Sequence, residues 1–189
     1  MGLVPWGYIL RKIICSLIFL AGISTSVWAV PCPADGFVQS AAKAYMGAAR
    51  SGSPQAFSNA AGRFTDLRRV AFFALGQYRH DLPRGREDEY VSLARNFVGR
   101  FMSQYAGSFS TSSVDIVSCA PGSGGLVVSA KLGGEKTIAF RLHGGGGSYR
   151  VDDMSVSSIW LVQAMKSKFT GVIASHGGDV TALLDWLRD

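Results

Sequence analysis

The fold is decided by residues 113–153, which read SVDIVSCAPGSGGLVVSAKLGGEKTIAFRLHGGGGSYRVDD. Apolar and polar residues alternate here, as expected of strands that bury one face and expose the other. Glycines separate the alternating runs, notably at Gly133-Gly134 and Gly144–Gly147, and glycine accepts the positive φ angles of tight turns. Consecutive strands joined by short turns pair with their neighbours, so this stretch predicts a four-stranded antiparallel meander.

Helical periodicity flanks the predicted sheet on both sides. The longest apolar stripe runs from Tyr90 to Tyr105, and acidic residues from Glu87 fill the first turn, where the helix dipole favours negative charge. Helices are predicted over residues 35–48, 55–61, 67–78, 87–105, 162–172 and 180–187. The predicted fold class is therefore α+β, with helices packed on one curved four-stranded antiparallel sheet.

The N-terminal segment is typical of a secretory signal peptide. Arg11 and Lys12 precede an apolar run, Ile13–Ile23, which is followed by small residues up to Ala29. Cleavage there would divide the chain into a signal peptide, residues 1–29, and a mature domain, residues 30–189. The apolar run is short for a membrane span, so a retained N-terminal anchor is the less favoured alternative.

The charge of the chain argues against a nucleic-acid partner. The formal net charge is +6, of which Arg11 and Lys12 supply two, and no dense basic run or nucleic-acid-reading motif appears. A mildly basic mature domain could favour anionic lipid surfaces, although an ordinary solvated surface explains the same excess.

Two cysteines remain after removal of the signal peptide. Cys32 and Cys119 form an even pair in an exported chain, which predicts a disulfide that ties the mature N-terminus to the first strand. Two free, buried thiols are the alternative.

Motifs that could carry catalysis lack their required partners. His143–Gly146 resembles an oxyanion-hole motif, but the sequence has no Gly-x-Ser-x-Gly nucleophile elbow, and a glycine hairpin explains it better. Strand alternation places Asp152 and Asp153 on opposite faces, which argues against a carboxylate dyad. We therefore predict no catalytic residue, no metal ligand and no cofactor, and hence no enzyme.

A series of short motifs runs through the mature chain in a fixed order. They are Phe64–Leu67, Ala74–Tyr78, the stripe Tyr90–Tyr105, Tyr149–Met154, Leu161–Phe169, Gly177-Gly178 and Leu183-Leu184. This series resembles the MlaC/toluene-tolerance family of periplasmic phospholipid-binding proteins, from about Ala34 to Leu187. The chain departs from that pattern at Arg79, where the family usually has tryptophan, and at Ser158 and Trp160, where it has glycine and serine.

The resemblance implies a periplasmic lipid carrier of an ABC-type transport system that maintains outer-membrane lipid asymmetry. The expected partners are a phospholipid, an inner-membrane ABC transporter with its lipid-binding ring protein, and an outer-membrane lipoprotein complex. One branch of the family is associated with hopanoid biosynthesis, so a polycyclic lipid is the alternative ligand.

Together, the resemblance and the many aromatic residues on inward faces lead us to expect that the sheet and helices enclose an apolar cavity. The expected lipid-binding residues are Phe72, Phe73, Leu75, Tyr78, Leu93, Phe97, Phe101, Ile116, Val128, Ile138, Phe140, Val151, Trp160 and Met165. The helix residues among them would face the sheet residues across the cavity, with its mouth near Trp160. A cone-fold enzyme with an acid or base inside, and an envelope interaction module with a filled core, are the competing classes.

Overall fold

The computed structural model describes residues 31–189. The predicted signal peptide, with Cys15 and the cleavage site at Ala29, lies outside the described residues. The helices are α1 (Asp35–Ser51), α2 (Pro54–Phe64), α3 (Leu67–Ala74), α4 (Glu87–Ser103), α5 (Leu161–Ser175) and α6 (Val180–Arg188), with short 3₁₀ helices η1 (Gly76–His80) and η2 (Ala106–Ser108). The strands are β1 (Val114–Gly122), β2 (Gly125–Leu132), β3 (Lys136–Gly145), β4 (Ser148–Val156) and β5 (Ile159–Trp160).

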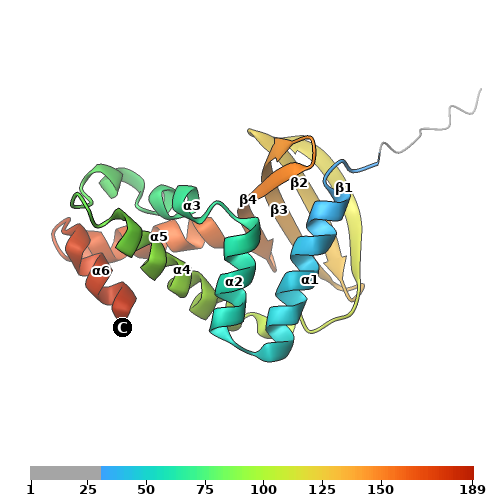
Figure 1. Cartoon of the computed structure of the whole chain (residues 1–189), viewed down its shortest axis with the longest axis horizontal. Helices are drawn as coiled ribbons and strands as arrows, with labels where there is room; N and C mark the ends of the chain where they lie inside the picture. The colour runs from blue at the N-terminus through green and yellow to red at the C-terminus, as the bar shows by residue number, and fades with distance from the viewer. Residues whose placement is uncertain (1–30) are drawn as a thin grey trace, which may run out of the picture. The chain divides into compact units, whose positions relative to one another are not determined.

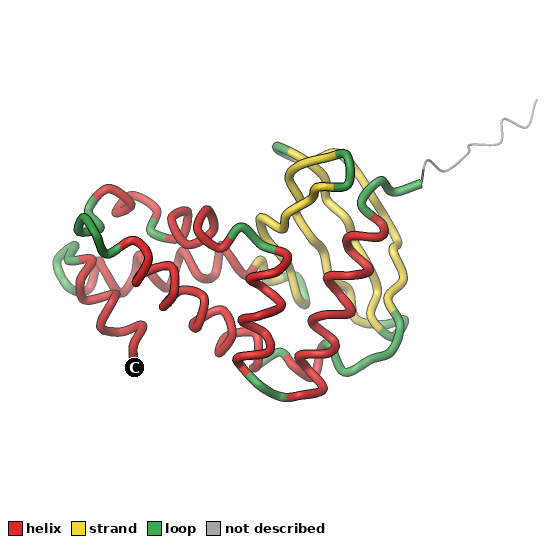
Figure 2. The backbone as a smooth tube through the Cα atoms, viewed as in Figure 1, coloured by secondary structure: helices red, strands yellow, loops and turns green. Residues whose placement is uncertain are grey.

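The strands form one antiparallel sheet in the order β1-β2-β3-β4-β5 (Figures 1 and 2). The α+β fold and the meander predicted from residues 113–153 are confirmed. Strand β5 has no counterpart in the predicted meander, because its two residues are too few to show a period. Gly133 and Gly134 adopt φ angles of 60° and 80°, the conformation that glycine tolerates best, in the turn between β2 and β3.

A β-bulge interrupts the pairing of β3 with β4. Arg141 pairs with Asp153 and Leu142 pairs with Val151, which leaves Asp152 as an extra residue on β4. A bulge breaks the alternation of side chains along a strand and can re-aim one of them. The expectation that Asp152 and Asp153 lie on opposite faces is therefore wrong, and both line the same groove described below.

One face of the sheet packs against α1, as Figure 1 shows. We call the buried side chains of α1, α2 and strands β1–β4 the sheet cluster; it includes Val38, Tyr45, Phe57 and Phe140. Phe57 and Phe109 both lie beside Tyr45, with ring centroids 6.4 Å and 5.8 Å from its ring. These rings fill the space between the helices and the sheet.

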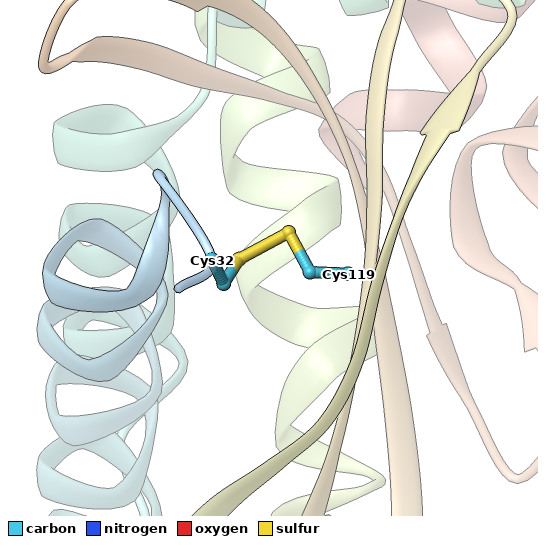
Figure 3. The surroundings of a disulfide bond; sticks show 2 residues. All are labelled: Cys32 and Cys119. Carbon is cyan, nitrogen blue, oxygen red and sulfur yellow. A yellow bond between two sulfur atoms is a disulfide. The ribbon is translucent and has the colours of Figure 1, made fainter. Parts of the chain in front are cut away.

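A disulfide joins Cys32, just before α1, to Cys119 on β1, with a Cα–Cα distance of 5.6 Å (Figure 3). The predicted disulfide is confirmed, and it does tie the segment before α1 to the first strand. Since β1 is an edge strand of the sheet, the bond fixes this edge to the N-terminal helix.

Helices α3, α4, α5 and α6 bury a second set of side chains, which we call the helical cluster. It includes Tyr90, Phe169 and Leu183, each of which is fully buried. The Tyr90 hydroxyl donates a hydrogen bond of 2.6 Å to the Ala71 carbonyl and so links α4 to α3. Burial raises the pKa of Tyr90, which therefore stays neutral.

Side-chain caps start two of these helices, α3 and α6. Asp66 accepts a hydrogen bond from the backbone N–H of Arg69, and Asp179 accepts one from the N–H of Thr181. The helix predicted to run through Tyr78 is wrong in its last turn. It ends at Ala74 because Gly76 adopts a φ of 58°, where any Cβ would lie 3.1 Å from side-chain atoms of Lys166 and Thr170 on α5.

Within residues 31–189, no helix is long and apolar enough to cross a membrane.

Candidate lipid-binding site

The sheet cluster and the helical cluster meet at a small apolar cavity of about 50 Å³, which we call the seam cavity. Val98 on α4 packs against both clusters. The walls come from α1, α2, α3, α4, β4 and α5, and the lining residues are Tyr45, Ala61, Thr65, Leu67, Val70, Phe97, Val98, Phe101, Met102, Val151–Met154, Leu161, Val162 and Met165.

Aromatic rings of α4 form one wall of the seam cavity. Phe97 and Phe101 stack with their centroids 5.8 Å apart, and Phe97 also meets Phe169 edge-on at 5.1 Å. Tyr45 also lines the cavity, and burial raises the pKa of Tyr45 to about 12, so its hydroxyl stays neutral. The cavity wall is therefore almost entirely apolar and carries no charge on the helix side.

A second, larger space opens to solvent beside the seam cavity. This open groove has a volume of about 670 Å³ and lies between α3, α5 and the β2–β3 region of the sheet. Val70, Asp152, Asp153 and Val162 line both the groove and the seam cavity, so these four residues form the partition between them. The remaining groove residues are Arg69, Phe72, Phe73, Arg79, Gly122, Ser123, Leu126, Val127, Arg141, Leu142 and Gln163.

Asp153 is the buried polar group of this partition, with only 4% of the residue exposed. Its Oδ1 accepts hydrogen bonds of 2.8 Å from the backbone N–H groups of Met154 and Val162. Its Oδ2 lies 3.6 Å from Arg141 Nη1 and has no hydrogen-bond partner among residues 31–189. Burial raises the pKa of Asp153, and the two backbone hydrogen bonds and Arg141 oppose that shift.

Asp152 lies close to a histidine and an arginine at the groove. Its Oδ1 lies 2.7 Å from His143 Nδ1, at ion-pair distance but outside hydrogen-bond geometry, and 3.4 Å from Arg69 Nε. Arg141 in turn lies over the ring of Trp160, with its guanidinium carbon 3.7 Å from the ring centroid. The charged residues that line the groove are thus two carboxylates and three arginines.

Six of the residues expected to bind lipid line these two spaces. Phe72 and Phe73 line the open groove, where Phe73 is 46% exposed. The other four are Phe97, Phe101, Val151 and Met165, which line the seam cavity.

The remaining eight lie away from both spaces. Leu75, Tyr78 and Leu93 pack in the helical cluster. Ile116, Val128, Ile138 and Phe140 belong to or pack against the sheet cluster. Trp160 lies beneath Arg141 and is absent from both linings. Among the helix residues expected to face the sheet across a cavity, Phe72 and Phe97 pack against the helical cluster, whereas Phe101 packs against the sheet cluster. The apolar space between the two clusters is small.

Helical and strand periodicity does not single out the partition residues Val70 and Val162 or the groove arginines Arg69 and Arg141. For Arg79 the only signal in the sequence is its departure from the family pattern. Arg141 could have been found from the alternation of β3, since it lies opposite Phe140 and Leu142 on the strand. The partition depends on the β-bulge at Asp152, for which the sequence carries no signal.

An apolar cavity under an open groove with a few polar groups is the usual form of a site for a hydrophobic or amphipathic small molecule. The fold and site therefore define an α+β ligand-binding protein. The chain belongs to the MlaC family, because the family model described as "MlaC protein" matches residues 39–189. The resemblance found in the sequence motifs is thereby confirmed.

A solved structure of similar fold is the phospholipid-binding protein from Ralstonia solanacearum in complex with a phospholipid. It aligns with a TM-score of 0.68 and 18% sequence identity over 82% of this chain and 94% of that chain. No curated protein sequence matches the chain.

Proposed function

We propose that this chain is an exported, periplasmic lipid carrier that holds the acyl chains of a phospholipid between its two hydrophobic clusters. Membership of the MlaC family supports this proposal, as does the fold shared with a phospholipid-binding protein. The signal-peptide pattern of residues 1–29 supports export of a mature domain, residues 30–189.

The energetics of lipid transfer explain why a carrier needs such a site. Each buried methylene is worth about 0.8 kcal/mol against water, so a two-chain lipid rarely crosses an aqueous gap alone. Transfer from a bilayer into an apolar protein site is close to neutral for the chains. An apolar interior beside a polar rim is therefore sufficient, and we propose binding and transport without a catalytic step.

The observation that carries the proposal is the apolar contact between two separately packed clusters, with a cavity along it. At about 50 Å³ the seam cavity has room for only a few water molecules. Acyl chains need much more space, so their entry requires the helical cluster to separate from the sheet cluster. Val70 and Val162 lie where the groove meets this contact, and we propose that the chains enter past them.

In this proposal the carrier receives or delivers its lipid at two membranes. One partner is an inner-membrane ABC transporter with its lipid-binding ring protein, and the other is an outer-membrane lipoprotein complex. These roles follow the resemblance to the MlaC family, and the transport system would maintain outer-membrane lipid asymmetry.

The test is the lipid content of the purified, exported protein, measured by mass spectrometry of solvent extracts. The wild-type protein is expected to carry phospholipid. Val70→Phe enlarges the partition residue that lines both spaces, so this variant is expected to lose most of the lipid. Val91→Phe is the matched control, because Val91 packs against the helical cluster but lines neither space.

The outcomes of this test distinguish the competing classes of protein and also test the proposed entry route. A hopanoid in place of phospholipid would assign the polycyclic-lipid branch. Absence of any lipid from the folded wild-type protein would contradict the carrier proposal and favour an interaction module. Equal loss in Val70→Phe and Val91→Phe would contradict the entry route.

A further inference from the structure

Three arginines from separate parts of the fold line the open groove: Arg69 on α3, Arg79 on η1 and Arg141 on β3. Within residues 31–189, none of their side chains donates a hydrogen bond, and Arg79 makes no ion pair. Each guanidinium carries five N–H donors in a planar fork. The groove therefore presents, from more than one of its sides, many cationic N–H donors that make no hydrogen bond within residues 31–189.

The nearby carboxylates do not satisfy these arginines. Arg69 Nε lies 3.4 Å from Asp152 Oδ1, and Arg141 Nη1 lies 3.6 Å from Asp153 Oδ2, both beyond the usual length of a charge-assisted hydrogen bond. Asp153 already accepts two backbone hydrogen bonds, and Asp152 is closest to His143. Each arginine keeps its remaining N–H groups for a ligand.

Arg141 is also held in place. Its guanidinium lies 3.7 Å from the ring centroid of Trp160, and this stacking fixes the plane of the fork. An arginine fixed in this way loses less side-chain entropy when it binds an anion in two-point geometry. Arg141 lines the groove and is half-exposed, with 44% of its side chain accessible.

The groove also has apolar lining residues beside its charged and polar ones. The apolar lining residues include Phe72, Leu126, Leu142 and Val162. Val162 also belongs to the partition between the groove and the seam cavity. A ligand that contacted both sets of residues would carry an anionic oxygen cluster next to alkyl chains. A phosphodiester on a lipid has this form, whereas a hopanoid hydrocarbon has no group for the arginines.

We propose that Arg69, Arg79 and Arg141 form a subsite for the phosphate of the lipid headgroup and select phosphate-bearing lipids over neutral lipids of the same chains. This inference rests on the proposed carrier function and specifies the part of the ligand that the groove reads.

The test compares binding of dioleoyl phosphatidylglycerol with binding of dioleoylglycerol, which has the same chains and no phosphate. The full exported protein is first stripped of lipid, and native mass spectrometry then measures occupancy in a competition between the two. Wild type is expected to prefer the phospholipid. Arg79→Gln and Arg141→Gln are each expected to reduce that preference by about three- to tenfold, the range for partly exposed charge-assisted contacts.

Two further variants keep the test specific. Arg84→Gln removes an exposed arginine that lies outside the groove, and its preference is expected to equal that of wild type. Arg141→Lys retains the charge but not the planar fork, so its preference should fall between those of wild type and Arg141→Gln. Dioleoylglycerol binding, measured separately without the phospholipid, should remain the same in all these variants.

Other outcomes overturn the proposal. Equal affinity of wild type for the two lipids, or unchanged preference in Arg79→Gln and Arg141→Gln, would remove the phosphate subsite while leaving the carrier function standing. Failure of wild type to bind either lipid would remove the carrier function itself and the subsite with it. Arginine-dependent binding of glycerol phosphate with the same affinity as phosphatidylglycerol would assign the groove to a free phosphate compound instead.

Discussion

Removal of the Cys32–Cys119 disulfide should lower the free energy of unfolding by an amount that depends on the length of the loop that the bond closes. The bond closes a loop of 87 residues. In the chain-entropy description, a cross-link over a loop of this length disfavours the unfolded state by about 4–5 kcal/mol at 25 °C. For a domain of this size, such a loss corresponds to a fall in melting temperature of about 10–18 °C.

The assay is chemical and thermal unfolding of wild type and of the double variant Cys32→Ser/Cys119→Ser, followed by circular dichroism. Reducing agent should lower the stability of wild type to that of the double variant and should leave the double variant unchanged. Both proteins should keep the same native spectrum, because the bond lies at the edge strand β1 and the clusters remain packed. Equal unfolding midpoints for oxidised wild type and the double variant would refute the reasoning.

Three further predictions concern packing and charge. Gly99→Ala should destabilise the protein by about 1–3 kcal/mol in denaturant titration, because a Cβ there would lie 2.1 Å from Ser58 Oγ and 2.4 Å from the Pro54 carbonyl oxygen on α2. The matched control is Gly171→Ala on α5, where a Cβ would have no atom within 4 Å; this variant should stabilise the protein by about 0.5–1 kcal/mol. Equal effects of the two variants would contradict the close approach of α2 and α4. Hydrogen bonds from Arg86 and Arg188 hold the pKa of Glu89 at about 2, so its contribution to stability is complete above the unfolded pKa of about 4.3 and is lost as the pH falls towards 2. Glu89→Gln should therefore show a smaller drop in melting temperature than wild type between about pH 4.3 and pH 2. An identical drop would argue against the pairing of Glu89 with the two arginines. Burial raises the pKa of Asp153, so the folded state binds this proton more tightly than the unfolded chain does, and the group's contribution to stability falls as the pH rises above about 3.9. Asp153→Asn should remove that part of the decline in stability between about pH 4 and pH 7. An unchanged decline would show that Asp153 titrates as it does in the unfolded chain.

The order of elements could be predicted from the sequence because its local signals agree. Residues 113–153 combine alternation with glycine turns, and the stripe from Tyr90 to Tyr105 fits only a helix. The disulfide was predictable because the predicted mature domain contains an even pair of cysteines. The end of α3 was not, because a helix that stops at a glycine such as Gly76 looks locally like one that continues through it.

The site was less predictable, because periodicity shows which side chains point inward but not which neighbours they meet. Phe97 and Phe140 both face inward, yet one lines the seam cavity and the other lies fully buried in the sheet cluster. Phe73 belongs to an apolar helix face but lies exposed, with the Lys166 ammonium 4.9 Å from its ring centroid. Asp152 faces the groove only because of a bulge, which depends on the pairing of two strands.

The position of the lipid chains tests the central claim most directly. A phospholipid with a photoreactive group near the end of one acyl chain would be loaded into the exported protein, cross-linked by light, and mapped by peptide mass spectrometry. We predict cross-links to Phe97, Phe101, Val151 and Met165 around the seam cavity. Cross-links confined to the exposed outer side of the sheet, for example at Val117, would contradict the claim that the chains lie between the two clusters.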